Sequence, residues 1–241
     1  PERMELRFRY FENLTLPSIA AQTDQDFTFL IVTGNSLPRQ YLRRLRDLTA
    51  PYKHIKIIQS GSMRQRLAMQ LAIKYELGRD DEESLQFRLD DDDAVATSFV
   101  AGIRWITRHS HGMRAQFENM AIDYSNGFSV ALSKDGILAE QVQTGFWACG
   151  LAVWFRAGHK KTVMNYPHHK LNKFMPTFIH PKPLMYLRGV HSDNDSTAQF
   201  ETDRPAPLSA ENRELFMTRF NVNEDHVKSA FSAPIGFRDI A

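Results

Sequence analysis

Four consecutive aspartates, Asp90 to Asp93, directly follow residues 85–89, where apolar and polar side chains alternate. Such alternation is typical of a β-strand, and a helical pattern begins near residue 97. Adjacent like charges repel, so a fold that presents them together usually neutralises them with a cation. A solvated acidic turn that caps the next helix explains the same run, because Asp favours helix N-termini. The strand would hold the run at a sheet edge, where open α/β sheets bind ligands.

The size and composition of the chain indicate one globular domain. A chain of 241 residues is long enough to bury a core without disulfides, and its 42% hydrophobic and 24% charged residues are ordinary for a globular protein. No repeat, low-complexity tract or linker divides it. The net charge of +2 gives no reason to expect a nucleic-acid partner.

Two further features bear on the compartment. The one cysteine, Cys149, excludes an internal disulfide framework and suits a reducing compartment, so we expect a cytoplasmic protein. No run of 18 apolar residues and no signal peptide is visible, so no transmembrane segment is expected.

Strand and helix patterns alternate over the first half of the chain. This order predicts an α/β fold with a mostly parallel sheet flanked by helices. Right-handed crossovers would bring the carboxyl ends of the strands, and the acid run with them, to one edge. We expect a helix at 2–21 interrupted by Pro17, strands at 27–32, 55–58 and 85–89, and helices at 38–49, 63–77 and 97–109.

The second half changes character after residue 110. Short alternating segments separated by Asn126-Gly127 and Asp135-Gly136 predict β-hairpins. Further strands are expected at 150–155 and 185–187, an irregular segment at 162–178, and small helices at 211–220 and 224–231.

Four blocks of sequence resemble a known enzyme class. They are the junction at 17–27 (PSIAAQTDQDF), the acid-run strand end at 87–93, the segment at 162–172 and the histidine block at 186–196. In this order they resemble the GT-A class of nucleotide-sugar glycosyltransferases, and more narrowly the bacterial rhamnosyltransferase family. The relatives begin with a strand that touches the nucleotide base and that would precede Glu2. Many relatives also carry an Asp where this chain has Gly34-Asn35-Ser36.

The resemblance implies both a fold and a reaction. The fold would be a single GT-A-like domain, with a nucleotide-sugar-binding half at 1–110, an acceptor-side half at 111–200 and a helical tail at 201–241. The reaction would move a sugar, with rhamnose suggested by the family name, from a nucleotide diphosphate to a hydroxyl acceptor with inversion. Mg²⁺ or Mn²⁺ would neutralise the departing diphosphate.

The resemblance also assigns roles to the acid run and the late histidine block. Asp92 would bind the metal, with His191 as a further ligand, and Asp93 is a second carboxylate ligand because the register within four aspartates is ambiguous. His191 has an alternative role as a hydrogen-bond partner of loop backbone. The donor would be held by Asp90, Asp91 and Asn194, through the ribose, the phosphates or water on the metal.

Arg64 and Arg66 lie in the first turn of the helix expected at 63–77. A guanidinium grips phosphate in a bidentate manner, and a helix N-terminus adds partial positive charge, so we predict that both contact the donor diphosphate. The alternative is a pair of solvated arginines on a surface turn.

An inverting transfer needs a base, and His168 and His169 occupy the expected place. A histidine with an ordinary pKa near ~6.5 suits a base, although two polar loop histidines are an equally simple explanation. Asp123 and Glu140 are fallback bases. Trp147 and Trp154 either stack on an acceptor sugar or belong to the core, and Cys149 is expected to be a buried, inert thiol.

Two other classes of function stay open. A nucleotidyltransferase or metal-dependent phosphoesterase also places paired aspartates at strand ends. A catalytically silent carbohydrate-binding protein of the same fold is the third possibility. The sequence holds no Gly-x-Ser-x-Gly, P-loop or Cys-x-x-Cys pattern, which argues against other hydrolases, P-loop enzymes and zinc sites.

Overall fold

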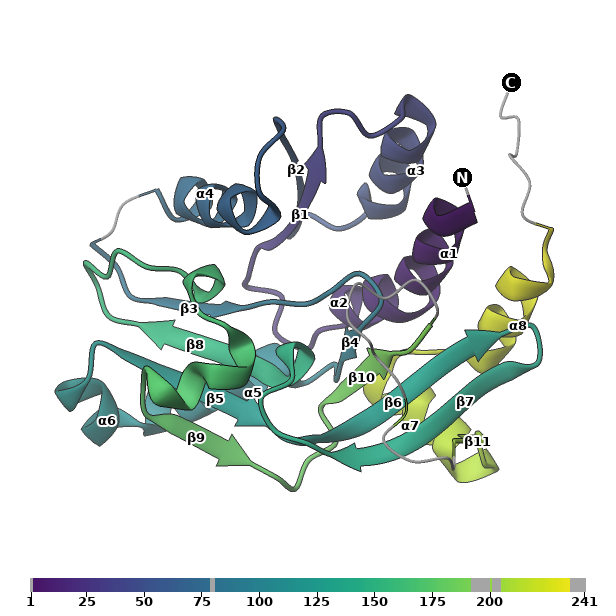
Figure 1. The fold of residues 1–241 in the computed structure, drawn as a ribbon. Coiled ribbons are helices and arrows are strands. Elements are labelled where there is room, and N and C mark those ends of the chain that lie inside the picture. Colours follow the sequence, from purple (N-terminus) through teal and green to yellow (C-terminus); the bar gives the residue numbers. More distant parts are fainter. Residues whose placement is uncertain (1, 79–80, 192–199, 201–204, 235–241) are drawn as a thin grey trace.

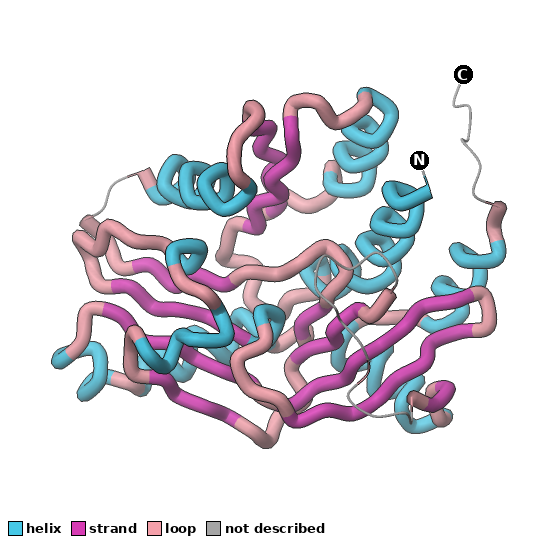
Figure 2. The backbone as a smooth tube through the Cα atoms, viewed as in Figure 1, coloured by secondary structure: helices cyan, strands magenta, loops and turns pink. Residues whose placement is uncertain are grey.

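Three β-sheets form the centre of a computed structural model that describes residues 2–78, 81–191, 200 and 205–234 (Figures 1 and 2). The smallest pairs β1 (Phe29–Gly34) with β2 (Ile55–Ser60). The second has the order β3 (Ser84–Phe87), β8 (Leu151–Phe155), β5 (Asn119–Tyr124), β9 (Thr177–His180). The third has the order β11 (Ala206–Pro207), β7 (Gly136–Gln143), β6 (Asn126–Ser133), β10 (Tyr186–Gly189), β4 (Ala94–Val95).

The sheets are mixed, so the prediction of a mostly parallel sheet is wrong. β1 and β2 are parallel as expected, but β3 pairs antiparallel with β8 instead of extending their sheet. The reason lies in β8, whose five residues are all buried and which therefore takes a central place between β3 and β5. Among the described strands, those at a sheet edge are β1, β2, β3, β4, β9 and β11.

The first helical segment has three parts. α1 (Glu2–Tyr10) continues through a π-helical turn, Phe11–Thr15, into α2 (Leu16–Ala20). The predicted interruption at Pro17 is therefore confirmed as a change of helix type, because proline has no N–H to donate within the helix. Tyr10, Leu14 and Ile19 are buried along one face.

The remaining helices, with one exception, match their predicted positions within a few residues. They are α3 (Arg39–Thr49), α4 (Gln65–Leu77), α5 (Phe99–His109), α6 (His111–Gln116), α7 (Ala210–Phe220) and α8 (Glu224–Ser232). The exception is α6, which was not predicted. None of the helices in the described ranges is both long enough and apolar enough to cross a bilayer. α4 lies above β3 and β8, and α8 lies beside the ends of β6 and β7 (Figure 1).

One main core joins the described parts into a single domain. It extends from Phe8 in α1 through Phe99 in α5 and Trp154 in β8 to Val227 in α8. A second, smaller core lies under α4, where Met69 and Ile73 pack on the segment 163–175. That segment, expected to be irregular, forms the 3₁₀ turns Val163–Asn165 and His168–Lys173.

The two predicted hairpins have different outcomes. Asp135-Gly136 forms the β6–β7 turn, with Gly136 at φ +122°, which confirms that prediction. Asn126-Gly127 does not form a hairpin, because β5 and β6 belong to different sheets. The glycine is needed for a different reason: a Cβ on Gly127 would lie 2.4 Å from the carbonyl oxygen of Tyr186 on β10.

Candidate active site

A cavity of about 820 Å³ lies between β1, the acid run and the end of β10. A volume of this size is typical of small-molecule sites. Its walls include side chains from three of the sequence blocks singled out above: Asp90, Asp91, Asp92, Asp93, His168, His169 and His191. The fold therefore brings residues about a hundred positions apart into one wall.

Asp92 and His191 form a close polar pair in this wall. Their Oδ2 and Nε2 atoms are 2.9 Å apart, and the side chains are 14% and 8% exposed. Strand pairing explains the meeting. The acid run leads directly into β4, β4 pairs antiparallel with β10, and β10 ends two residues before His191.

Gly189 fixes the position of the acid run against β10. Its N–H donates to Asp93 Oδ1 at 3.0 Å, and a Cβ at this position would lie 2.2 Å from the backbone oxygen of Asp92. Burial raises the pKa of Asp93 well above its usual range, and the charges of Asp92 and Asp90 raise it further. The observed contact of Asp93 is thus structural; its role as a metal ligand stays a prediction.

The ring of Tyr10 packs against the imidazole of His191. The two ring centroids are 4.6 Å apart. The Tyr10 hydroxyl donates to Val190 O at 3.1 Å and accepts from Leu132 N at 3.0 Å. Burial raises the pKa of Tyr10 to about 12, so the phenol stays neutral. Two hydrogen bonds of the Tyr10 hydroxyl therefore hold the ring that lies beside His191.

Asp91 and Asp90 have different surroundings. Asp91 accepts both guanidinium bonds of Arg7, at 2.8 and 2.6 Å, so its observed partner is a side chain of α1. The carboxylate of Asp90 is 53% exposed and lies 3.9 Å from Arg88 Nη2. Partial burial raises the pKa of Asp90, the Arg88 charge lowers it, and Asp92 and Asp91 raise it again. Asp90 is thus the carboxylate of the run that faces the cavity most openly.

The Asp92–His191 pair fits a divalent cation. Ligands about 2.1 Å from a metal, in neighbouring positions of an octahedron, lie about 3 Å apart, as these two atoms do. The described residues contain no group of three His, Cys, Asp or Glu side chains placed to hold a metal. Two protein ligands and several oxygens from a bound ligand or water are the arrangement that Mg²⁺ commonly has.

His168 and His169 lie on the 3₁₀ turn at 168–173 and line the cavity together. Their ring centroids are 5.4 Å apart. Burial lowers the pKa of His168 to about 4, and the charges of Arg88, His169, Arg66 and Arg188 contribute. Its Nδ1 is buried and has no hydrogen-bond partner in the described part of the chain. The ring is therefore neutral near pH 7.

Comparison with protein-family models identifies the chain. Residues 1–203 match the family described as "Putative rhamnosyl transferase". The chain belongs to this family. The match includes every residue of the cavity wall and excludes α7 and α8. A search of curated proteins finds no match.

In this rhamnosyl transferase family member, Arg64 and Arg66 do not reach the cavity wall. Arg64 is the N-cap of α4, Arg66 lies in its first turn, and both are exposed. Of this segment, Gln65 and Met69 line the cavity. The charge of Arg66 still reaches His168, whose pKa it helps to lower. Contact of the two arginines with a donor stays a prediction, and Asn194 lies outside the described residues.

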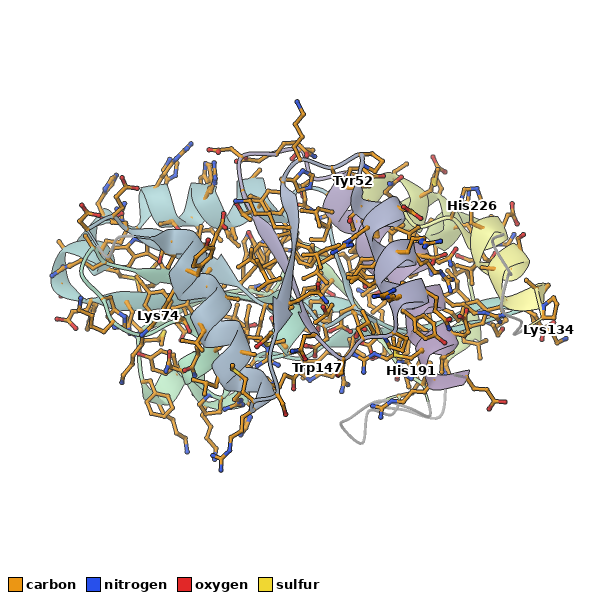
Figure 3. The ribbon with its side chains drawn as sticks, turned by 90° about the horizontal axis from the view of Figure 1, so that it is seen from above. Tyr52, Lys74, Lys134, Trp147, His191 and His226 are labelled. Carbon is orange, nitrogen blue, oxygen red and sulfur yellow. The ribbon has the colours of Figure 1, made fainter. Side chains whose placement is uncertain are left out.

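Sequence reasoning missed three arginines that line the cavity: Arg7, which binds Asp91, and Arg88 and Arg188. Arg88 lines the cavity with its Nε buried and without a hydrogen-bond partner among the described residues. Arg188 lines it too, with its guanidinium carbon 4.3 Å from the ring centroid of Trp147. Trp147 and His191 lie on the same side of the molecule in Figure 3. Arg88 and Arg188 lie inside the sequence blocks that resemble the family, a signal that could have identified them.

The fallback bases lie outside the wall of the cavity. Asp123 is fully buried, and its Oδ2 accepts from Phe146 N at 3.0 Å. Burial raises the pKa of Asp123 to about 6. It fixes the loop that carries Phe146 and Trp147, both of which line the cavity. Glu140 is 9% exposed on β7.

The other two side chains considered from sequence are core residues. Trp154 is 1% exposed, and its Nε1 donates to Glu83 at 3.1 Å. Cys149 is 1% exposed, and burial raises its pKa well above the usual range. A thiol with a raised pKa carries little thiolate, which fits the predicted inert role.

Proposed function

We propose that this chain is a metal-dependent glycosyltransferase that moves a sugar from a nucleotide diphosphate to a hydroxyl acceptor. Membership of the family supports the reaction class, and its name suggests rhamnose as the sugar. The observation that carries the metal-dependent form is the Asp92–His191 pair, 2.9 Å apart in the wall of a cavity of about 820 Å³.

Asp92 and His191 would hold Mg²⁺ or Mn²⁺. The ion, when bound, neutralises the charge that develops on the departing diphosphate. Among these ions Mn²⁺ accepts an imidazole nitrogen more readily than Mg²⁺, which prefers oxygen ligands. We therefore expect the stronger effect with Mn²⁺.

The cavity arginines supply positive charge without a metal. The guanidinium carbon of Arg188 lies 4.3 Å from the ring centroid of Trp147. The buried Nε of Arg88 has no hydrogen-bond partner among the described residues. Guanidinium groups bind phosphate oxygens through paired hydrogen bonds, so we assign Arg88 and Arg188 to the donor diphosphate. The open carboxylate of Asp90 is placed to accept hydrogen bonds from ribose hydroxyls.

The acceptor would enter beside the two histidines. A pKa of about 4 makes His168 a weak base at neutral pH. We therefore assign proton removal from the acceptor hydroxyl to His169, which is exposed and lines the same cavity. His168 is assigned a positioning role as a neutral hydrogen-bonding group. The acceptor oxygen would attack the anomeric carbon from the face opposite the diphosphate as the bond to the diphosphate breaks and the acceptor proton passes to His169, which gives inversion.

The experiment that tests the proposal is calorimetric binding of UDP, dTDP and GDP, each with and without Mn²⁺. The proteins are wild type, Asp92→Asn and the control Asp135→Asn, whose side chain is 81% exposed in the β6–β7 turn. We expect Mn²⁺-dependent binding of one nucleotide, lost in Asp92→Asn and kept in the control. Nucleotide binding that is equal with and without Mn²⁺, and equal in wild type and Asp92→Asn, would overturn the metal site.

A second measurement separates the reaction classes. The nucleotide that binds is supplied as its sugar conjugate, with and without hydroxyl acceptors, and the products are followed by mass. Sugar transfer that requires the acceptor supports a glycosyltransferase. Release of nucleoside monophosphate and sugar 1-phosphate, or of inorganic phosphate, without an acceptor would identify a phosphoesterase. Metal-independent sugar binding alone would identify a silent binding protein.

A further inference from the structure

Helix α4 turns a row of large apolar side chains toward solvent. On α4, Leu67, Leu71 and Tyr75 recur every four residues and are 45%, 49% and 82% exposed, and Met63, two residues before the helix begins, is 43% exposed. Residues four apart share one face of a helix, so this row is continuous. The opposite face of α4 packs on the second core through Met69 and Ile73. The outer row therefore adds nothing to the core, and exposed apolar rows of this kind mark contact surfaces.

A second segment lies beside α4 and extends the same surface. Gln70 Nε2 donates to Met164 O at 3.3 Å, which ties the helix to the segment 156–174. Phe174, at the end of this segment, is 54% exposed. We call the surface formed by residues 63–75 and 156–174 the basic apolar face.

The charge on the basic apolar face is of one sign. The two segments contain no Asp or Glu, although the whole chain has 28 acidic and 30 basic residues. Glu76, which follows Tyr75, is ion-paired with Lys56 at 2.5 Å. The basic residues of the two segments are Arg64, Arg66, Lys74, Arg156, Lys160, Lys161, Lys170 and Lys173.

We propose that the basic apolar face binds the surface of a bilayer that contains anionic lipids. A row of aliphatic and aromatic side chains enters the boundary between headgroups and acyl chains, and flanking Lys and Arg bind anionic headgroups. A nucleic-acid partner would account for the basic residues, but it would offer no apolar surface to the side chains from Met63 to Tyr75. A protein partner explains the apolar row but gives no reason for eight basic residues and no Asp or Glu in the two segments.

The cavity opens next to this face. Gln65, Met69, His168 and His169 belong to the two segments and also line the cavity. Binding to a bilayer would therefore bring the histidine side of the cavity close to the membrane surface. If the proposed glycosyltransferase function holds, an acceptor attached to a lipid is the substrate class that this placement favours. The membrane contact itself does not depend on that function.

The test is co-sedimentation with vesicles of phosphatidylcholine alone or with 40% phosphatidylglycerol added. The apolar variant is Leu67→Gln/Leu71→Gln, matched by Met217→Gln, which is 46% exposed on α7. The charge variant is Lys170→Glu/Lys173→Glu, matched by Lys134→Glu, whose side chain is 69% exposed. Lys134 lies at the opposite end of the molecule from Lys74, which belongs to the basic apolar face (Figure 3).

We expect wild type to sediment with the phosphatidylglycerol vesicles and to be released by 0.5 M salt, which screens charges beyond a few ångströms. Affinity should fall at least tenfold in the apolar variant and at least about fivefold for each Lys changed to Glu in the charge variant. The two control variants should bind as wild type does.

Several results would overturn the proposal. One is equal binding by the apolar variant and Met217→Gln, and another is no binding of wild type to either kind of vesicle. If a 20-base-pair DNA duplex competes with the vesicles, and the apolar variant binds the vesicles as wild type does, the face is a polyanion site instead. A dimer that Leu67→Gln/Leu71→Gln dissociates in size-exclusion chromatography would identify a contact between two copies of the chain.

Discussion

The phenol ring of Tyr10 lies against the imidazole of His191, with 4.6 Å between the ring centroids. Nε2 of the same imidazole lies 2.9 Å from Oδ2 of Asp92. A side chain of the first helix thus positions the residue that completes the candidate metal pair. Because the Tyr10 hydroxyl also bonds Val190 and Leu132, the ring cannot turn away without breaking two hydrogen bonds.

Substitution of Tyr10 should separate stability from metal binding. Tyr10→Phe keeps the ring but leaves two buried backbone groups unsatisfied, so we expect the free energy of unfolding to fall by about 2 kcal/mol. Nucleotide affinity with Mn²⁺ should change less than about threefold, since the aromatic ring beside the imidazole is kept. Tyr10→Ala removes the ring and should weaken Mn²⁺-dependent binding clearly more. Urea unfolding and calorimetry measure both, with Tyr75→Phe, 82% exposed, as the control.

Gly189→Ala should disturb the acid run through the backbone. The new Cβ would lie 2.2 Å from Asp92 O, so either β10 or the acid run must move. We expect a loss of about 3 kcal/mol in stability, as for other overpacked sites, together with loss of Mn²⁺-dependent nucleotide binding. The control is Gly61→Ala, where a Cβ meets nothing within 4 Å. Equal stability of the two variants would show that the acid run is not held by β10.

Asp123 should make stability depend on pH. Its folded pKa of about 6 exceeds the usual unfolded value near ~3.9, so the folded state holds the proton more tightly. The contribution of Asp123 is therefore fully present below about pH 4 and is lost as pH rises toward about 6. Two pKa units correspond to at most about 3 kcal/mol.

The variant Asp123→Asn keeps an oxygen for Phe146 N and carries no charge. It leaves one amide donor to be satisfied, so we expect a gain of about 1–2 kcal/mol at pH 7.5 and no gain at pH 4. Urea unfolding at both pH values, with Asp135→Asn for comparison, measures the effect. An equal change at both pH values would mean that the carboxylate is not the source of the pH dependence.

Local pattern predicted where most helices and strands lie, but not which strands pair. The run from Leu151 to Phe155 was recognisable as a buried strand, yet nothing local shows that β3 and β5 would flank it. Periodicity reports whether a side chain is buried. The partner of a strand depends on contacts between residues far apart in the chain, such as Ser84 and Phe155.

The same limit applies to the acid run. Sequence singled out four aspartates and left their register open. The structure gives each a different environment: Asp90 faces the cavity, Asp91 binds Arg7, Asp92 contacts His191 and Asp93 accepts from Gly189. Arg7 and Asp91 are 84 residues apart, so no local pattern relates them.

Arg188 offers the sharpest test of how the cavity binds a diphosphate. Its guanidinium lies on Trp147 in the cavity wall, where a phosphate would gain paired, charge-assisted hydrogen bonds. Arg188→Ala should weaken binding of the preferred nucleotide diphosphate about 10- to 100-fold, and binding of the matching nucleoside hardly at all. Arg188→Lys should recover only part of the loss, because an ammonium has neither the fork nor the stacking surface of a guanidinium.

The control is Arg108→Ala, an exposed arginine near the end of α5. Calorimetry with the nucleoside, monophosphate and diphosphate shows at which phosphate the loss appears. A loss that is equal for nucleoside and diphosphate would mean that Arg188 supports the cavity wall through Trp147 and does not touch the phosphates. A loss confined to the diphosphate would place the leaving group of the transfer between Arg188 and the Asp92–His191 pair.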